Sequence, residues 1–542
     1  MYECPPKQPQ SVDLIATKAT SMSGGWELLG LNTALQILLF LSLSPEGWCA
    51  LILAFSPFHL GSAVMSDFSV RLWHQYLSKV FLGVVMLFGV VACGSSDDSS
   101  DPDSGYLQLI NGLNDSPDLK FELRDDEDDV VVSSESFGFQ RASALLVLSE
   151  GVYQLEVNVE DPIGGFEDVL LEREIDIHGD ILKTFVLEGS LASNTFRLIE
   201  KDIGDLAEAR EDDADDLLEL QVINLSADTV SVYVADEVDR PDQENLVGTV
   251  ASGSHSDAVD FVYDEDAEYR VRLTADASDE LIFESNEVEF SPNTRTTIVV
   301  NDNVGPDPDS LSVWLVRDNS TASQRNRFAK SGFRVVNLVQ DVADAAIVIT
   351  NDVGDENLFS DNMAPTDIGA FTRADSGFVR VEARAPSDAE LLETGSVSLD
   401  PDIAYSLLVT GSGVQANGGL LMRANQMNFR SVANSINVHF INALSETDEE
   451  DVNAVDFYAL GDDDSLSGSS PVLSGVGYLE GGSIVLDAKS YRFLITTRNT
   501  HSILAGPEPL SPPQGGEKYI IAASEAIGGG TPNILTVAHQ DE

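Results

Sequence analysis

The sequence predicts an all-β protein built from four tandem immunoglobulin-like β-sandwich domains. The first observation behind this is a motif of apolar, polar, apolar, apolar and asparagine residues, which ends at Asn111, Asn224, Asn337 and Asn442, at intervals of 113, 113 and 105 residues. The second is that short strands of alternating apolar and polar residues follow each asparagine in the same order. The third is that convincing amphipathic helices are scarce. Units of about 100 residues with many short strands favour a sandwich.

Each repeat contains further strands after the opening motif. A second strand comes soon after the asparagine, an aromatic-led strand begins at Tyr153, Tyr269, Phe378 or Tyr491, and a closing strand covers 184–187, 297–300, 405–409 or 519–522. Turn formers such as Gly179-Asp180 and Pro512-Pro513 precede the closing strands. We place repeats 1 to 4 at 105–200, 217–318, 331–430 and 434–540, with linkers at 201–216 and 319–330. The best helix candidate, Ile203–Leu218, is acidic enough to be part of a linker.

Composition excludes several classes of function. The 542 residues carry a formal net charge of −61, so the surface repels nucleic acid, and a nucleic-acid partner is excluded. The three cysteines are too few for a disulfide framework and fit no zinc spacing. The histidines are scattered without ligand spacing, so isolated surface or packing roles are expected for them.

The segment around Cys93 predicts export and lipidation. Arg71 and Lys79 precede an apolar run of 13 residues at 80–92, which suits a signal peptide and is too short to span a membrane. Val90-Val91-Ala92-Cys93-Gly94 resembles the bacterial lipobox, in which the cysteine thiol accepts a diacylglycerol. We therefore predict a lipoprotein signal peptide at 65–92, and a lipidated Cys93 with a polar tether at 93–104. The lipid would hold the protein on a membrane of the bacterial cell envelope.

Two neighbouring features extend this interpretation. In the lipoproteins that the segment resembles, an aspartate after the cysteine retains the protein in the inner membrane, so Gly94 indicates the outer membrane, on its periplasmic or its outer side. Residues 1–64 fit no exported protein, because a signal peptide inside a chain is not normally recognised. We interpret them as an upstream extension, with translation starting at Met65. The alternative is a pair of short membrane segments around Leu35–Leu43 and Ala50–Phe55.

The repeated strands also carry a family resemblance. The opening strand with its polar end, the alternating second strand, the Gly151-Val152-Tyr153 strand and the closing strand resemble the bacterial domain of unknown function 4397. The glycine of that pattern is replaced by Glu268 in repeat 2 and by Ser490 in repeat 4. The resemblance implies tandem β-sandwiches in exported, lipid-anchored proteins, and it brings no catalytic residues.

Acidic clusters are the obvious candidates for metal binding. Carboxylate oxygens are the ligands that Ca²⁺ prefers, and the weak candidates are Asp302, Asp307, Asp309, Asp462, Asp463 and Asp464. None of them matches an EF-hand or the nonapeptide calcium repeat. Solvated loops on an acidic protein are the simpler interpretation, so we expect no cofactor beyond weak Ca²⁺ binding.

Three further expectations concern side chains in the repeats. We expect the four repeated asparagines to shape turns at strand ends, and the aromatic residues that lead the later strands to fill the cores, the tyrosines with a corner-type hydroxyl bond. We expect Trp314, the one tryptophan after Cys93, to report on repeat 2 alone. Arg325, Arg327 and Lys330 form one of the few basic spots, which is expected to meet an acidic neighbouring face.

No arrangement of residues typical of catalysis is present: there is no G-x-S-x-G elbow and no phosphate loop. The sequence therefore predicts a non-catalytic, lipid-anchored envelope protein for binding, adhesion or scaffolding, whose ligand is an unidentified protein or polysaccharide. The alternative is an envelope hydrolase with a carboxylate site hidden in one domain. Repeat 4 is the place to look for such a site, because it has an insertion near Ser445–Ala454.

Overall fold

The computed structural model describes residues 40–43, 49–52, 104–160, 166–179, 181–193, 197–205, 217–236, 244–275, 280–339, 344–351, 357–384, 391–412, 419–444, 454–526 and 530–539. The chain divides into two compact units, 1–98 and 99–542. In the first unit, β1 (Phe40–Leu43) and β2 (Cys49–Ile52) form an antiparallel pair. The predicted signal peptide, Cys93 and Gly94 lie outside the described residues. Among those described, no helix is long and apolar enough to cross a membrane.

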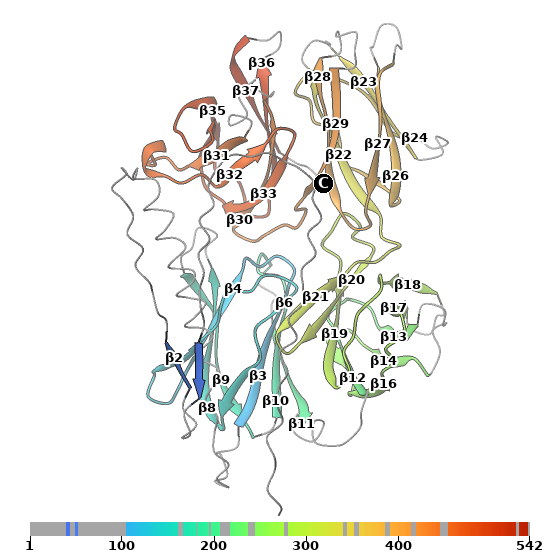
Figure 1. The fold of residues 1–542 in the computed structure, drawn as a ribbon, viewed down its shortest axis with the longest axis vertical. Coiled ribbons are helices and arrows are strands. Elements are labelled where there is room, and N and C mark those ends of the chain that lie inside the picture. Colours follow the sequence, from blue (N-terminus) through green and yellow to red (C-terminus); the bar gives the residue numbers. More distant parts are fainter. Residues whose placement is uncertain are drawn as a thin grey trace, which may run out of the picture. The chain divides into compact units, whose positions relative to one another are not determined.

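The second unit contains the four repeats, which are almost entirely β-strand (Figure 1). The strands of repeat 1 are β3 (Ser104–Leu113), β4 (Leu119–Arg124), β5 (Val130–Ser133), β6 (Arg141–Ala142), β7 (Leu146–Ser149), β8 (Gly151–Glu160), β9 (Phe166–Ile177), β10 (Ile181–Gly189) and β11 (Arg197–Asp205). Those of repeat 2 are β12 (Leu217–Asn224), β13 (Val230–Asp236), β14 (Leu246–Val250), β15 (Ser254–His255), β16 (Val259–Val262), β17 (Tyr269–Ala275), β18 (Leu281–Glu284), β19 (Thr294–Asp302), β20 (Leu311–Arg317) and β21 (Ser320–Gln324).

Repeats 3 and 4 repeat this order. The strands of repeat 3 are β22 (Ser331–Val339), β23 (Ala345–Asn351), β24 (Asn357–Met363), β25 (Thr372–Ala374), β26 (Gly377–Arg384), β27 (Leu391–Leu399), β28 (Ala404–Ser412) and β29 (Gly419–Met427). Those of repeat 4 are β30 (Ser435–Ala443), β31 (Ala454–Leu460), β32 (Leu473–Gly477), β33 (Gly481–Asp487), β34 (Tyr491–Thr497), β35 (Ile503–Leu510), β36 (Lys518–Ala526) and β37 (Gly530–His539), with one 3₁₀ turn, η1 (Leu466–Gly468).

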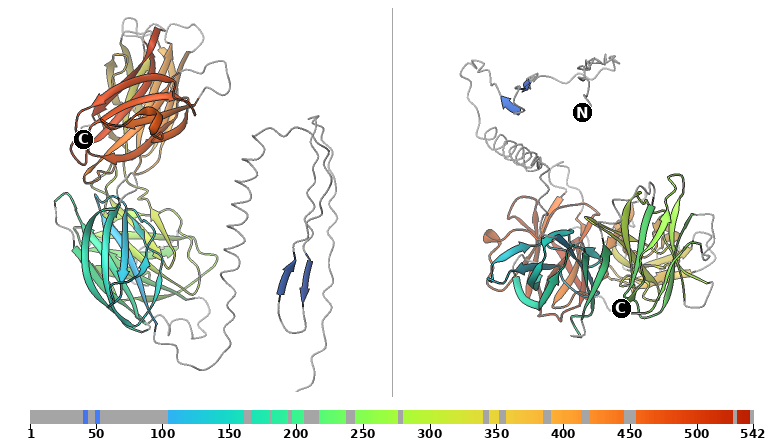
Figure 2. Two further views of the ribbon diagram at one scale, coloured as in Figure 1. Left: turned by 90° about the vertical axis from the view of Figure 1, so that its left-hand side faces the viewer. Right: turned by 90° about the horizontal axis from the view of Figure 1, so that it is seen from below.

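Every repeat is a sandwich of two sheets, and Figure 2 gives two further views of these strands. In repeat 1 the sheet orders are β11-β10-β3-β6 and β5-β4-β8-β9, and repeats 2 and 3 follow the same scheme. In repeat 4 a single pair between β35 and β37, Ala505 with Asn533, joins the two sheets at one edge. The predicted class of tandem β-sandwiches is confirmed. Its strand order has one distinctive feature: the opening strand lies parallel to the closing strand in the same sheet, as β3 does to β10.

Each sandwich has its own apolar core between its two sheets. Alternation places one side of every inner strand in this core. In repeat 1, for example, Leu107 and Leu109 of β3 pack with Phe121 of β4 and Leu155 of β8, all fully buried. Equivalent clusters fill repeats 2, 3 and 4.

The opening strands are buried on their other face as well, because repeat 1 packs against repeat 2. Ile110 of β3 and Val186 of β10 point away from their own core and meet Ile223, Val299 and Trp314 of repeat 2. All five are 0–1% exposed. Fully burying each such aliphatic side chain stabilises the protein by about 1.5–3 kcal/mol, so this contact is a second core shared by two sandwiches.

Repeats 3 and 4 pair through the same face. Val336 of β22 and Leu408 of β28 pack against Ile441 of β30 and Ile520 of β36, and all four are 0–1% exposed. The fourth residue of the opening motif therefore packs against the neighbouring sandwich in every repeat. Two sandwich pairs, 1 with 2 and 3 with 4, form the second unit.

Several sequence-based boundaries need correction. The expected linker at 201–216 begins as the end of β11, which pairs with β10 from Glu188↔Arg197 to Ile181↔Asp205. The expected linker at 319–330 contains β21, which pairs with β20. The stretch Ile203–Leu218, the best helix candidate in the sequence and interpreted as part of a linker, is β-strand at both ends, because β11 runs to Asp205 and β12 starts at Leu217. Each repeat thus has a strand after its closing strand, which extends the sheet that faces the neighbour.

Two expectations about aromatic side chains are also wrong. Phe378 does not fill a core: Val379 and Val381 point inward, so the alternation of the strand turns Phe378 outward, and it is 60% exposed. Trp314 does not belong to repeat 2 alone. Its ring lies 5.7 Å from that of Phe139 of repeat 1 (between centroids) and is buried between the two sandwiches.

The pairing of repeats 1 and 2 predicts the effect of truncating Ile110. Ile110→Ala leaves a cavity between the sandwiches and should lower the free energy of unfolding by about 2–5 kcal/mol. In a chain that begins at Cys93, Trp314 is the only tryptophan, so its fluorescence during urea denaturation reports this interface directly. The control is Val152→Ala on β8, whose side chain is 52% exposed and should cost no more than about 0.5 kcal/mol. Equal effects of the two changes would refute the shared core.

Candidate functional site

The four repeated asparagines are buried and shape turns, as expected. Asn111 Oδ1 accepts a hydrogen bond from the Leu113 amide at 3.1 Å, and Asn442 does the same with Leu444 at 3.1 Å. Their side-chain amides donate to nearby chain, for example from Asn442 Nδ2 to the Val476 carbonyl at 3.1 Å. Each asparagine satisfies backbone groups where its strand ends, so none is left to bind a ligand.

The weak calcium candidates do not converge. Asp302 Oδ1 accepts from the Ala227 amide at 3.2 Å, Asp307 Oδ2 from the Lys330 amide at 2.8 Å, and Asp464 Oδ2 from the Gly461 amide at 2.8 Å. Asp309, Asp462 and Asp463 are exposed. Within the described ranges, no group of three or more histidine, cysteine or acidic side chains is placed to hold a metal ion.

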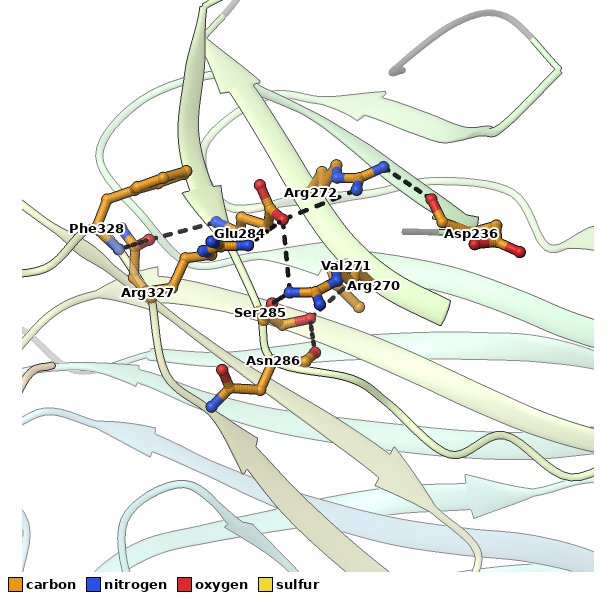
Figure 3. A network of polar contacts seen from close by, with 10 residues as sticks. Asp236, Arg270, Val271, Arg272, Glu284, Ser285, Asn286, Arg327 and Phe328 are labelled. Atoms are coloured by element: carbon orange, nitrogen blue, oxygen red, sulfur yellow. Dashed lines mark hydrogen bonds and ion pairs between the residues drawn. The ribbon is translucent and has the colours of Figure 1, made fainter. Parts of the chain in front are cut away.

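The basic spot at 325–330 is used mainly inside repeat 2 (Figure 3). Arg327 forms an ion pair with Glu284 at 3.0 Å, and Arg270 and Arg272 approach the same carboxylate at 3.7 and 3.8 Å. Glu284 is only 8% exposed, so the three guanidinium groups stabilise a carboxylate that would be costly to bury alone. The expected acidic partner is therefore a residue of the same repeat. Arg325 contributes electrostatically to Asp402 of repeat 3.

The loop after β3 is the point at which separate repeats meet. Asn301 Nδ2 of repeat 2 donates to Asn114 Oδ1 at 2.9 Å. Arg430, which follows β29, donates to the carbonyls of Asn114 at 3.3 Å and Ser116 at 2.7 Å. The Ala433 amide donates to the Asp115 carbonyl at 2.7 Å. The loop 114–116 is thus tied to repeat 2 and to the segment between repeats 3 and 4.

Stacked cations and rings surround this junction. Phe371 stacks on Phe429 with ring centroids 4.6 Å apart. Lys518 Nζ lies 4.2 Å from the Phe429 centroid, and the Arg334 guanidinium lies 5.6 Å from that of Phe371. Such cation–π contacts contribute about 0.5–2 kcal/mol each. Gly332 makes room for the stack, since a Cβ at this position would lie 2.1 Å from the Phe371 ring.

A cavity of about 250 Å³ lies among these groups. All four repeats and the segment between repeats 3 and 4 contribute to its lining, which consists of Asn114, Asp115, Asn303, Val304, Gly305, Pro308, Arg373, Phe429, Arg430, Ser431 and Lys518. Three of these side chains are cationic and one is a carboxylate. We call this space the junction cavity. Because it gathers three cationic side chains, we take it as the candidate ligand site.

Asp402 connects repeat 3 to repeat 2 beside the junction cavity. Its Oδ1 accepts a hydrogen bond from Asn303 Nδ2. Burial is the main cause that raises the pKa of Asp402 to about 6. The nearby Asp307 also raises this pKa, whereas the hydrogen bond from Asn303 and the charge of Arg325 lower it. Asp402 is therefore a titrating group at a contact between repeats.

His439 is the corresponding group between repeats 3 and 4. Its Nε2 lies 3.0 Å from Ser406 Oγ of repeat 3, and its Nδ1 lies 3.0 Å from Ser483 Oγ of repeat 4. The ring is 2% exposed, and burial lowers the pKa of His439 to about 4. The neutral imidazole can donate to one hydroxyl and accept from the other, so it bridges the pair without charge.

Comparison with known proteins leaves the family open. No model of a protein family matches the chain, and no curated protein matches it. The resemblance to the domain of unknown function 4397 therefore stays a prediction.

Three solved structures illustrate the range of likeness. The Bacillus anthracis TIE protein is 10% identical over 79% of this chain and 76% of its own, with a TM-score of 0.14. A "putative adhesin" from Bacteroides ovatus is 12% identical over 40% of this chain and 97% of its own, with a TM-score of 0.17. A "putative cell adhesion protein" from Bacteroides eggerthii is 11% identical over 39% of this chain and 96% of its own, with a TM-score of 0.18. TM-scores this low carry no argument about function.

Sequence reasoning missed the junction cavity altogether. Asp115, Arg373, Arg430 and Lys518 are isolated in the sequence, and no spacing connects them. The composition held one signal that could have pointed to these residues. A chain with 30 basic and 91 acidic residues has few cations, so each cation is worth examining as a possible binding residue. The insertion near Ser445–Ala454, where a hidden hydrolase site was considered, lies outside the described residues except for Ala454.

The raised pKa of Asp402 gives a pH-dependent prediction. The folded state holds this proton up to about pH 6, whereas the unfolded carboxyl releases it near 3.8, so the stabilisation is complete below pH 4 and is lost as pH rises through 6. Asp402→Asn keeps the acceptor for Asn303 and removes the charge. It should raise the free energy of unfolding at pH 7.5 by about 1–3 kcal/mol and leave it unchanged at pH 4.

Chemical denaturation at both pH values measures this difference. Asp462→Asn, at an exposed loop position, is the control and should give the same stability difference at pH 4 and pH 7.5. A stability gain for Asp402→Asn that is independent of pH would show that removing the charge is not its cause.

His439 should give the opposite pH dependence. Its folded pKa of about 4 lies below the ordinary histidine value of 6.5, so the unfolded state binds the proton first and stability falls as pH drops from 6.5 to 4. The loss should reach about 3 kcal/mol for a shift of this size. His439→Gln should flatten this acid limb, and the exposed His501→Gln should not, as measured by thermal unfolding across that pH range. An unchanged acid limb in His439→Gln would count against the buried neutral imidazole.

Proposed function

We propose that the protein is a non-catalytic, lipid-anchored component of the bacterial cell envelope that serves in binding, adhesion or scaffolding. The observation that carries the proposal is the pairing of sandwiches through buried sheet faces. Contacts between domains are usually modest and allow relative motion, whereas extensive apolar contacts suppress it. A chain that commits one face of every sandwich to its neighbour is suited to presenting a surface of fixed shape.

The remaining surface supports the same proposal. The outer sheets β5-β4-β8-β9, β14-β13-β17-β18 and β24-β23-β26-β27 take no part in the shared cores and are available to a partner. The net charge of −61 of the whole chain favours partners with cationic or neutral surfaces, such as a protein or a polysaccharide, and disfavours nucleic acid. The anchor proposed for this body is the lipid on Cys93, in the outer membrane.

Membrane fractionation tests the lipid anchor, and protease accessibility on intact cells tests on which side of the outer membrane the repeats lie. We expect wild-type protein to fractionate with membranes and Cys93→Ala to appear in the soluble fraction, because the diacylglycerol is lost. Cleavage by external protease in intact cells would place the four repeats outside, and protection until the outer membrane is broken would place them in the periplasm. Membrane attachment that survives Cys93→Ala unchanged would refute the lipid anchor.

A further inference from the structure

We propose that the junction cavity binds a small oxyanion of the phosphate or sulfate class through Lys518, Arg373 and Arg430. This inference goes beyond the proposed function and does not depend on the lipid anchor. It rests on the balance of charge in the cavity, on the way the cationic groups are held, and on the size of the space.

The charge of the junction cavity opposes that of the chain. The whole sequence has about three acidic residues for every basic one, whereas this lining has three cations and one carboxylate. That carboxylate, Asp115, is already engaged: it accepts hydrogen bonds from Ser190 Oγ at 2.7 Å and from the amides of Leu191 at 2.7 Å and Ala192 at 2.8 Å. Outside the lining, Asp402 accepts a hydrogen bond from Asn303, and Asp118, at an exposed position, acts electrostatically on Arg430. The lining therefore carries an excess of positive charge in a strongly acidic chain.

The two arginines are oriented by bonds that occupy only part of each guanidinium. Arg373 donates from Nε to the Pro306 carbonyl at 2.6 Å, and Arg430 donates from one terminal nitrogen to the carbonyls of Asn114 and Ser116. A guanidinium has five N–H donors in a planar fork that matches the oxygens of phosphate, sulfate and carboxylate. Fixing one edge to backbone lowers the entropy cost of binding with the other edge.

Lys518 is the most buried of the three cationic residues. It is 5% exposed, and its ammonium lies against the face of Phe429. The attraction between an ammonium and an anion is stronger in a site shielded from water than at the surface. Of the three cations in the lining, Arg373 is the exposed one. An anion would therefore pass Arg373 and reach Lys518.

The size and walls of the cavity suit a small charged ligand. A volume of about 250 Å³ corresponds to about eight water molecules at roughly 30 Å³ each, enough for one tetrahedral oxyanion with its remaining waters. Phe429 has Phe371 on one face and Lys518 on the other, so it offers no free platform for stacking a sugar ring. Recognition must then come from charge, either of the free ion or of a sulfate or phosphate ester that ends a glycan.

Calorimetric titration of the full chain with sodium sulfate and sodium phosphate, at constant ionic strength against sodium chloride, tests this inference. We expect saturable binding of sulfate or phosphate and a rise in melting temperature that chloride does not produce. Lys518→Met keeps the apolar stem on Phe429 and should weaken binding at least tenfold. Arg373→Gln, at an exposed position, should weaken it about fivefold and serves if the lysine variant does not fold.

Lys489→Met is the matched control. Lys489 also lies over an aromatic ring of repeat 4, 5.6 Å from the Tyr491 centroid, but it does not line the cavity, so its loss should leave binding unchanged. A sulfated disaccharide compared with its desulfated form separates the two sources: tighter binding of the sulfated sugar than of free sulfate assigns the site to an ester end group, and the reverse assigns it to the free ion. Equal effects of all anions at matched ionic strength, or unchanged binding in both cavity variants, would overturn the proposal.

Discussion

The second buried face of the opening strands is the constraint on which the rest of the structure depends. A strand at the surface of a sandwich buries alternate residues, but β3, β12, β22 and β30 are buried along nearly their whole length. These strands need apolar residues on both faces of their sheet. At positions where alternation would put polar residues they therefore carry Ile110, Ile223, Val336 and Ile441. The cost is that polar residues on the same face need partners in the neighbouring repeat. Gln108 finds one at 3.0 Å in the Arg317 carbonyl, and His439 in Ser406.

The scarce cations are concentrated at places where this arrangement needs them. Arg430 donates to carbonyls of repeat 1, and its guanidinium lies 5.2 Å from the Phe139 centroid. Burial lowers the pKa of Arg430, although the nearby Asp118 and Asp115 carboxylates act in the opposite direction. Arg334 and Lys518 lie on the aromatic stack. In an acidic chain, each buried cation also reduces the repulsion that opposes bringing four negatively charged sandwiches together. The junction is therefore electrostatically distinct from the surface around it.

The sequence predicted what is local and missed what is remote. The four repeats, the tandem sandwich class and the role of asparagines such as Asn111 followed from periodicity and turn chemistry. The end of β11 and the whole of β21 were interpreted as linkers, because these segments lack a regular alternation of apolar residues. The pairing of repeats left one visible signal, the apolar residue before each asparagine, which breaks the alternation of a half-buried strand. The junction cavity left none, since its residues come together only through pairing.

The parallel arrangement of β3 and β10 has a mechanical consequence. Tension applied through the chain before Ser104 acts along β3, while the rest of the protein holds β10 in register from Leu182↔Tyr106 to Gly189↔Leu113. A pull in this direction loads the hydrogen bonds between the two strands together, in shear, rather than one after another as in the peeling of a hairpin. The first strand of the body is thus arranged as a clamp at the point where a load would enter.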